Sequence, residues 1–304
     1  MMNYIIETRN ISKHYGNLIA VNKVSIGVKK GEIYGFLGLN GAGKTTTIKM
    51  LLGMIKPTEG EAIIYGKKIL PGEIEIWQKV GYIVEIPYSY PELTVKENLE
   101  LFYKLRQMKE KNMIDRIIQK LKLSEYCNVK AQHLSQGNLQ RLGLAKALIH
   151  DPDILILDEP INGLDPAGIV EIREMLKELS CQYQKTIFIS SHILSEISKL
   201  ADRIGIIQEG RLIKEIDEKQ LQNELTTKLI VKTRDNTNAL KILLSKNVNS
   251  RLINDHLEIF DKELIKKPED ITVLLTNYSL PPFLIHTVEE DLEHYFLRII
   301  GVKN

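Results

Sequence analysis

The chain has 304 residues, a length that suits one large domain together with a smaller one. Its 41 lysine and arginine residues stand against 39 aspartate and glutamate residues, so the formal net charge at pH 7 is only +2. A balance this close to neutral supplies no field of one sign that would draw the protein onto nucleic acid or anionic lipid.

The N-terminal stretch MMNYIIETRN lacks the basic region and the apolar core of a signal peptide. No stretch of the sequence approaches the roughly 18 consecutive apolar residues of a spanning helix. The two cysteines, Cys127 and Cys181, have no CxxC spacing, which fits inert thiols in a reducing cytosol. We therefore expect a soluble chain that exerts any membrane role through a partner.

Buried strands alternate with helices in the first two thirds of the chain. Residues 21–37 alternate and then run apolar, which predicts a buried strand ending at a glycine-rich turn, and a helix is expected over 44–54. Further apolar runs at 154–157 and 186–190 are flanked by helical patterns, as in a parallel sheet covered by helices. Such a sheet binds nucleotides at the carboxyl ends of its strands.

The pattern changes twice more along the chain. Residues 93–148 show helical spacing throughout and are expected to form a helical insert within a first domain over 1–220. Residues 221–304 are expected to form a small α+β, ferredoxin-like domain of β-α-β-β-α-β order. This second domain shows no glycine-rich loop, paired carboxylates or metal-ligand spacing, so a packing or docking role is expected for it.

A glycine-rich loop lies between the first predicted strand and helix. Residues 38–45 read GLNGAGKT and match the phosphate-binding pattern GxxxxGK[ST]. Gly38, Gly41 and Gly43 let the backbone curl so that successive N–H groups face phosphate oxygens at the positive end of the following helix. Asn40 belongs to the same loop and is expected to contact the nucleotide. A turn that merely caps a helix is the alternative, and the acids found downstream argue against it.

Side chains suited to magnesium ATP surround this loop. Lys44 is expected to reach the β and γ phosphates, Thr46 to contact the α-phosphate, and Thr45 to offer Mg²⁺ a hydroxyl. Asp158 and Glu159 end a predicted strand at the same sheet edge. Carboxylates placed there cost desolvation free energy unless a cation or a substrate pairs with them. We expect Asp158 to hold Mg²⁺ through water and Glu159 to act as the base that polarises the attacking water.

Two further positions extend this prediction. His192 follows the third predicted strand and is placed to hydrogen-bond the γ-phosphate, although a lone histidine is a weak signal. Residues 134–141 read LSQGNLQR, in which Ser135 caps a helix and Gly137 permits close approach. The free N–H groups and the dipole of such a helix can face an anion.

The LSxGxxQR pattern of residues 134–141 resembles the signature of the ABC ATPases. The resemblance extends over roughly residues 4–215, with Tyr15 as the aromatic that stacks on adenine. Asp165 closes the sequence NGLD, the loop that communicates between paired sites in that family. The resemblance implies an α/β, P-loop NTPase fold with an ABC-type helical subdomain, and ATP and Mg²⁺ as its cofactors.

The resemblance also implies partners. Two copies would meet head to tail as a homodimer, in which Ser135 and Gly137 of one subunit complete the nucleotide site of the other. ATP binding would favour the closed dimer and hydrolysis would release it, a population shift that can move a separate integral membrane permease. We therefore expect the protein at the cytoplasmic face of the cell membrane, with residues 85–103 lining the groove that docks the permease.

One position departs from the usual family pattern. Where most members carry glutamine in GYxxQ, this chain has Glu85, which keeps an oxygen for Mg²⁺ or catalytic water and adds negative charge near Asp158 and Glu159. Such a glutamate resembles the ATPase subunits of bacitracin-type and lantibiotic self-protection exporters, as does the closing sequence at 287–301, TVEEDLEHYFLRIIG. The resemblance implies export of, or self-protection against, an antimicrobial peptide, and another exported substrate stays open.

Two other functions are weighed. Soluble ABC ATPases that act on the ribosome or on nucleic acid typically carry two such cores or a coiled-coil insert, whereas this chain has one core and near-neutral charge. A non-hydrolysing switch is opposed by the presence of both Glu159 and His192. We therefore expect a transport-coupled ATP hydrolase without a nucleic-acid partner.

Overall fold

The computed structural model describes residues 4–72, 75–85, 88–110 and 112–301. The chain divides into two compact units, Met1–Glu218 and Lys219–Asn304. This division lies two residues before the boundary expected from the sequence, after residue 220. None of the helices within the described ranges is long and apolar enough to cross a membrane.

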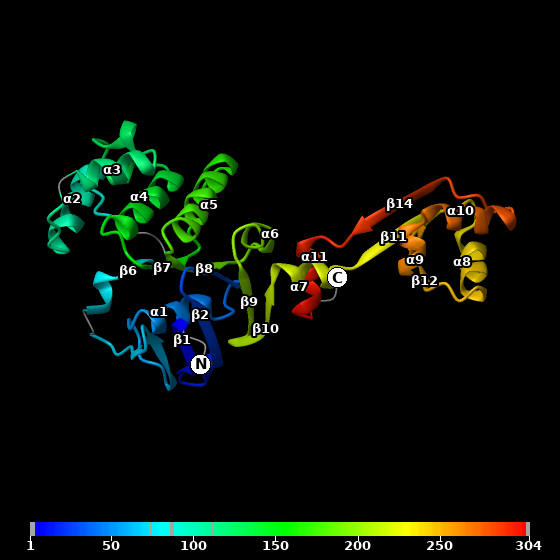
Figure 1. Ribbon diagram of the computed structural model, residues 1–304, viewed down its shortest axis with the longest axis horizontal. Coiled ribbons are helices and arrows are strands. Elements are labelled where there is room, and N and C mark those ends of the chain that lie inside the picture. The colour runs from blue at the N-terminus through cyan, green and yellow to red at the C-terminus, as the bar shows by residue number, and fades with distance from the viewer. Residues whose placement is uncertain (1–3, 73–74, 86–87, 111, 302–304) are drawn as a thin grey trace. The chain divides into compact units, whose positions relative to one another are not determined.

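A six-stranded sheet forms the centre of the first unit (Figure 1). Its strands, in spatial order, are β10 (Arg211–Asp217), β9 (Arg203–Gln208), β3 (Ile33–Leu37), β8 (Thr186–Ser191), β7 (Ile154–Asp158) and β6 (Val80–Ile83). Strands β9 to β6 in that order run parallel, and β10 returns antiparallel to β9. Every residue of β3, β7 and β8 is buried, which is why these three strands read as unbroken apolar runs. The predicted apolar runs at 154–157 and 186–190 are confirmed as the parallel strands β7 and β8.

A second, antiparallel sheet also belongs to the first unit. It consists of β2 (Leu18–Lys29), β1 (Tyr4–Tyr15), β4 (Glu59–Ile64) and β5 (Lys67–Lys68), in that order. The prediction of one strand over residues 21–37 is wrong, because this stretch contributes β2 to one sheet and β3 to the other. The chain turns between them at Gly31, whose φ of 72° lies in the left-handed region that favours glycine.

Helices cover the central sheet and form the insert. The described helices of this unit are α1 (Lys44–Leu51), α2 (Val95–Leu105), α3 (Met113–Lys120), α4 (Gln136–Leu148), α5 (Pro166–Cys181), α6 (Leu194–Ile197) and the short 3-10 turns Glu75–Gln78, Ser124–Tyr126 and Ala131–His133. Helix α1 is shorter than predicted, since the chain turns at Gly53 with φ of 63°. Helices α2, α3 and α4 occupy the region of the expected insert and gather on one side, away from β1 and β2 (Figure 1).

The second unit folds around a four-stranded antiparallel sheet. Its elements are α7 (Glu218–Glu224), β11 (Thr227–Lys232), α8 (Asn236–Ser245), β12 (Ser250–Ile253), β13 (His256–Ile259), α9 (Lys262–Lys266), α10 (Pro268–Asn277), β14 (Leu284–Glu289) and α11 (Leu292–Ile299). The strands lie in the order β12-β13-β11-β14, and Leu229, Val231, Leu243, Ile271 and Leu275 form its core. The ferredoxin-like description of this unit stays a prediction.

Candidate nucleotide site

The loop between β3 and α1 has a backbone that only glycine accommodates at several positions. Gly41 and Gly43 have φ values of 81° and 105°, in the left-handed region. A Cβ at Gly38 would lie 2.6 Å from the carbonyl oxygen of Ile207, whereas a Cβ at Gly41 would meet no atom within 4 Å. The loop is therefore packed against the sheet on one side and open on the other.

The open side faces a pocket of about 550 Å³. The lining residues are Tyr15, Leu18, Ile19, Ala20, Leu39, Asn40, Gly41, Gly43, Lys44, Thr45, Thr46, Glu159, Glu209 and Gly210. Most of the side chains expected to bind nucleotide thus meet in one cavity. Tyr15 is 49% exposed at this cavity, so its ring is available for stacking.

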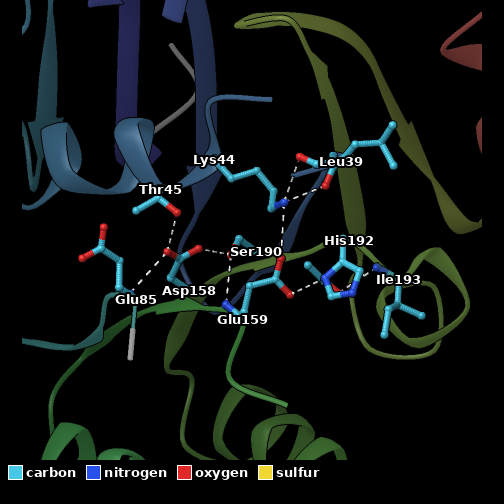
Figure 2. A network of polar contacts seen from close by, with 11 residues as sticks. Leu39, Lys44, Thr45, Glu85, Asp158, Glu159, Ser190, His192 and Ile193 are labelled. Atoms are coloured by element: carbon cyan, nitrogen blue, oxygen red, sulfur yellow. Dashed lines mark hydrogen bonds and ion pairs between the residues drawn. The ribbon is translucent and has the colours of Figure 1, made fainter. Parts of the chain in front are cut away.

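Lys44 lies under the loop and is nearly inaccessible, with 6% of its surface exposed. Its Nζ donates hydrogen bonds to the carbonyl oxygens of Gly38 at 2.6 Å and Leu39 at 3.2 Å. The same atom is 3.3 Å from Glu159 Oε1, which makes an ion pair across the pocket (Figure 2). The ammonium group is therefore held where the loop curls.

Asp158 is a buried carboxylate, 3% exposed, and is held by two hydroxyl groups. Thr45 Oγ1 donates to its Oδ2 at 2.7 Å, and Ser190 Oγ donates to its Oδ1 at 2.5 Å. Within the described residues no lysine, arginine or histidine forms an ion pair with it. A buried carboxylate without a cation is costly, and Mg²⁺ prefers carboxylate and hydroxyl oxygens. The pair of Thr45 and Asp158 therefore fits a magnesium ion.

Glu159 directly follows and points into the pocket. Its backbone φ is 49°, and its N–H donates to Ser190 Oγ at 3.0 Å. Its Oε2 lies 3.0 Å from His192 Nδ1, while its buried Oε1 accepts no hydrogen bond from any described residue. The left-handed backbone turns the carboxylate of Glu159 away from Asp158, so the two adjacent acids face different partners (Figure 2).

The side chain of Glu85 points away from Asp158. Its Oε1 forms an ion pair with Lys49 Nζ at 2.6 Å, and 61% of the side chain is exposed. Only its backbone N–H faces the site, 3.5 Å from Asp158 Oδ2 (Figure 2). The expected role of Glu85 in metal binding and catalysis stays a prediction. Its neighbours Ile86 and Pro87 lie outside the described residues.

The predicted site residues at the starts of α4 and α5, Ser135, Gly137 and Asp165, do not line this pocket. Ser135 caps α4, where its Oγ accepts a hydrogen bond from the Asn138 N–H at 3.2 Å. Asp165 caps α5 in the same way, through the Gly168 N–H at 3.1 Å. A Cβ on Gly137 would lie 3.2 Å from the Gly163 carbonyl oxygen, so α4 passes close to the loop before α5. These residues form a second surface that is distinct from the pocket.

Comparison with known proteins identifies a family of nucleotide-binding proteins that this chain resembles. Residues 21–162 match the family described as ABC transporter. The chain is 40% identical to the bacitracin transport ATP-binding protein BcrA of Bacillus licheniformis over 311 residues, which cover 99% of this chain and 98% of that protein. This chain belongs to the ABC transporter family. The family and the P-loop NTPase fold predicted from the sequence are confirmed.

Two other members of the ABC transporter family resemble it. The lantibiotic transport ATP-binding protein SrtF of Streptococcus pyogenes is 38% identical over 223 residues, which cover 73% of this chain and 95% of that protein. A solved dimeric ATP-binding cassette in a post-hydrolysis state, bound to ADP and Pi, has a TM-score of 0.64 and 27% identity. That comparison covers 70% of this chain and 98% of the other.

Sequence reasoning missed two connections in this ABC transporter protein. Ser190 was recognised only as the end of a strand, although it joins Asp158 to the backbone of Glu159. Gln140 of α4 donates from Nε2 to the Glu159 carbonyl oxygen at 3.3 Å, which ties the signature helix to the acid. A polar residue at the carboxyl end of a buried strand was the available signal for Ser190.

Proposed function

We propose that this chain binds MgATP and hydrolyses it as the motor subunit of an ABC transporter. The observation that carries this proposal is the meeting of Lys44, Asp158 and Glu159 at the carboxyl edge of one sheet, each with a different partner. A cation for phosphate, a buried carboxylate for Mg²⁺ and a second carboxylate for water are the components that phosphoryl transfer to water requires.

The residues divide the chemistry between them. The loop N–H groups and Lys44 bind the phosphates of the substrate, and Thr45 and Asp158 hold Mg²⁺, which neutralises charge on the phosphate oxygens when bound. Glu159 accepts a proton from the attacking water through Oε1 or Oε2. His192, 3.0 Å from Oε2, fixes the orientation of that carboxylate.

The active unit is a head-to-tail homodimer. Ser135 is exposed at the N-terminus of α4, and neither Ser135 nor Gly137 lines the pocket of its own chain. A helix N-terminus favours an anion, so this surface suits the phosphates bound by a second copy. The solved cassette of the same fold that holds ADP and Pi is also dimeric.

The motor acts on a separate permease at the cytoplasmic face of the cell membrane. Residues 85–103 include part of α2 and line the groove that receives the permease, although Ile86 and Pro87 are not described. The exported substrate is an antimicrobial peptide of the bacitracin or lantibiotic type, which is supported by the transport proteins that the sequence resembles. Neither relative suggests the ribosomal or nucleic-acid function.

Co-purification tests the assignment directly. We expect a tagged chain, solubilised gently from its native host, to bring down a polytopic membrane protein. Recovery of ribosomal or DNA-associated proteins instead would overturn the transporter assignment. Deleting the gene should sensitise the host to bacitracin or to a lantibiotic but not to an antibiotic that acts inside the cell. Unchanged susceptibility to both peptides would refute the substrate class and leave the motor function standing.

A further inference from the structure

An acid of the nucleotide pocket lies in the turn between β9 and β10. Gln208 pairs with Arg211 across this hairpin, so Glu209 and Gly210 are the two residues of its loop. Both have left-handed backbones, with φ values of 48° and 75°, as a two-residue hairpin turn of type I′ requires. Both residues also line the pocket, and Glu209 is exposed there.

Glutamate is an unusual residue at the first position of such a turn. Asparagine, aspartate and glycine adopt the left-handed backbone at lower cost and are the residues usually found there. The carboxylate of glutamate extends one methylene further from the backbone than that of aspartate. It forms no ion pair with any lysine, arginine or histidine that the structure describes. Neither the turn nor a neighbouring cation therefore gives a reason for Glu209.

The tip of this hairpin lies where the two ends of the pocket meet. The N–H of Gly210 donates to the carbonyl oxygen of Ala42 in the phosphate-binding loop at 2.9 Å. A Cβ at Gly210 would lie 2.8 Å from the carbonyl oxygen of Ala20 in β2, the strand that follows Tyr15 along the chain. A nucleotide with its base on Tyr15 and its phosphates in the loop would therefore place its ribose beside Glu209.

The acids that line the pocket among the described residues divide between its two ends. Glu159 lies at the phosphate end, where its Oε1 is 3.3 Å from Lys44 Nζ. Glu209 has no such cation beside it, and phosphate oxygens would repel its charge. A favourable contact for this carboxylate therefore needs hydrogen-bond donors on the nucleoside.

We propose that Glu209 binds the ribose of the nucleotide, with its carboxylate accepting hydrogen bonds from the 2′ and 3′ hydroxyl groups. This inference rests on the proposed hydrolysis of ATP and adds a residue that selects ribose over deoxyribose. An ionised carboxylate only accepts hydrogen bonds, and two neighbouring hydroxyl donors suit its two oxygens. The edge of adenine fits less well, because ring nitrogens that are themselves acceptors flank its amino group.

The test measures by calorimetry how the purified chain binds ADP, 2′-deoxy-ADP and 3′-deoxy-ADP, none of which has a γ-phosphate to hydrolyse. We expect the wild type to bind each deoxy nucleotide ~5-fold or more weakly than ADP, because a charged acceptor loses a donor. Glu209→Asn, which suits the left-handed backbone, should bind all three within about twofold of one another. The matched control Asp151→Asn removes an exposed acid with φ of 48° outside the pocket and should discriminate like the wild type.

Inosine diphosphate separates the sugar from the base, since it lacks the amino group of adenine. Glu209→Asn should leave the ratio of ADP to inosine diphosphate affinity unchanged. Glu209→Gly, which the turn also accommodates, takes its place if the asparagine variant does not fold. The proposal is overturned if the wild type binds the deoxy nucleotides as tightly as ADP, if the variant keeps the discrimination, or if only the inosine ratio responds. A wild-type chain that binds none of these nucleotides would instead refute the nucleotide function itself.

Discussion

Replacing Glu159 with glutamine separates two roles of this carboxylate. The amide keeps the shape of the side chain but cannot accept a proton from water, and removal of a general base typically costs ~10²–10⁴-fold in turnover. The substitution also removes the negative charge 3.3 Å from Lys44 Nζ, which leaves that ammonium free to face phosphate. Because the Glu159 side chain is 20% exposed, we set the competing interaction at about 1 kcal/mol, which corresponds to roughly fivefold tighter ATP binding.

The assay measures phosphate release and ATP affinity on the same purified variants, together with their oligomeric state. We expect Glu159→Gln to accumulate as an ATP-bound dimer with turnover lost and ATP affinity raised. The control is Glu209→Gln, which removes an acid that lines the same pocket without pairing with Lys44. A monomeric Glu159→Gln chain with more than a tenth of the normal turnover would refute the reasoning. Equal tightening by Glu209→Gln would show that Lys44 is not the group released.

Three further predictions concern Ser190, the ion pair of Lys49 with Glu85, and the buried His150. Ser190→Ala removes the hydroxyl that joins Asp158 to the Glu159 N–H and should lower ATP turnover about tenfold, since two hydrogen bonds are lost. The control is Ser180→Ala, because Ser180 is also buried and donates a hydrogen bond to the Gly31 carbonyl oxygen. This control should lose similar stability in thermal unfolding and keep its ATP turnover. Lys49→Met breaks the exposed pair with Glu85 and should change the free energy of unfolding by less than about 1 kcal/mol. It should nevertheless shift permease-coupled ATP turnover in the same direction as Glu85→Gln. Independent effects of the two variants on this turnover would exclude a shared role. Burial lowers the pKa of His150 from 6.5 to about 4, so between these pH values the unfolded chain binds a proton that the folded chain does not. The free energy of unfolding should therefore fall by about 2 kcal/mol as the pH drops through this window. Denaturant titrations at several pH values should show a smaller fall for His150→Gln, and an equal fall in the variant and the wild type would be inconsistent with a buried neutral imidazole.

The parallel sheet and its loop were predictable because their signals are local. Strands β3, β7 and β8 are buried on both faces, so each appears as an apolar run whose last residues mark the sheet edge. The antiparallel sheet was not predicted, because β1 has an irregular burial pattern and repeated register shifts against β2. Such irregularities break the alternation on which strand recognition depends.

The sequence by itself was enough to identify the family and to predict the groups of the site: the loop of residues 38–45, the two acids at the end of β7 and the helix capped by Ser135 lie in short segments with recognisable residue types and spacing. Tertiary structure alone decided where those groups point. Glu85 and Lys49 are 36 residues apart, and their pairing turns the carboxylate away from Asp158, a direction that no local pattern encodes. Lys146 likewise belongs to an ordinary helix in the sequence, and only packing against Tyr88 and Phe102 makes it a buried charge that pairs with no carboxylate of the described residues. Burial and unpaired charge arise from segments distant in the chain, so they emerge only when the chain is folded.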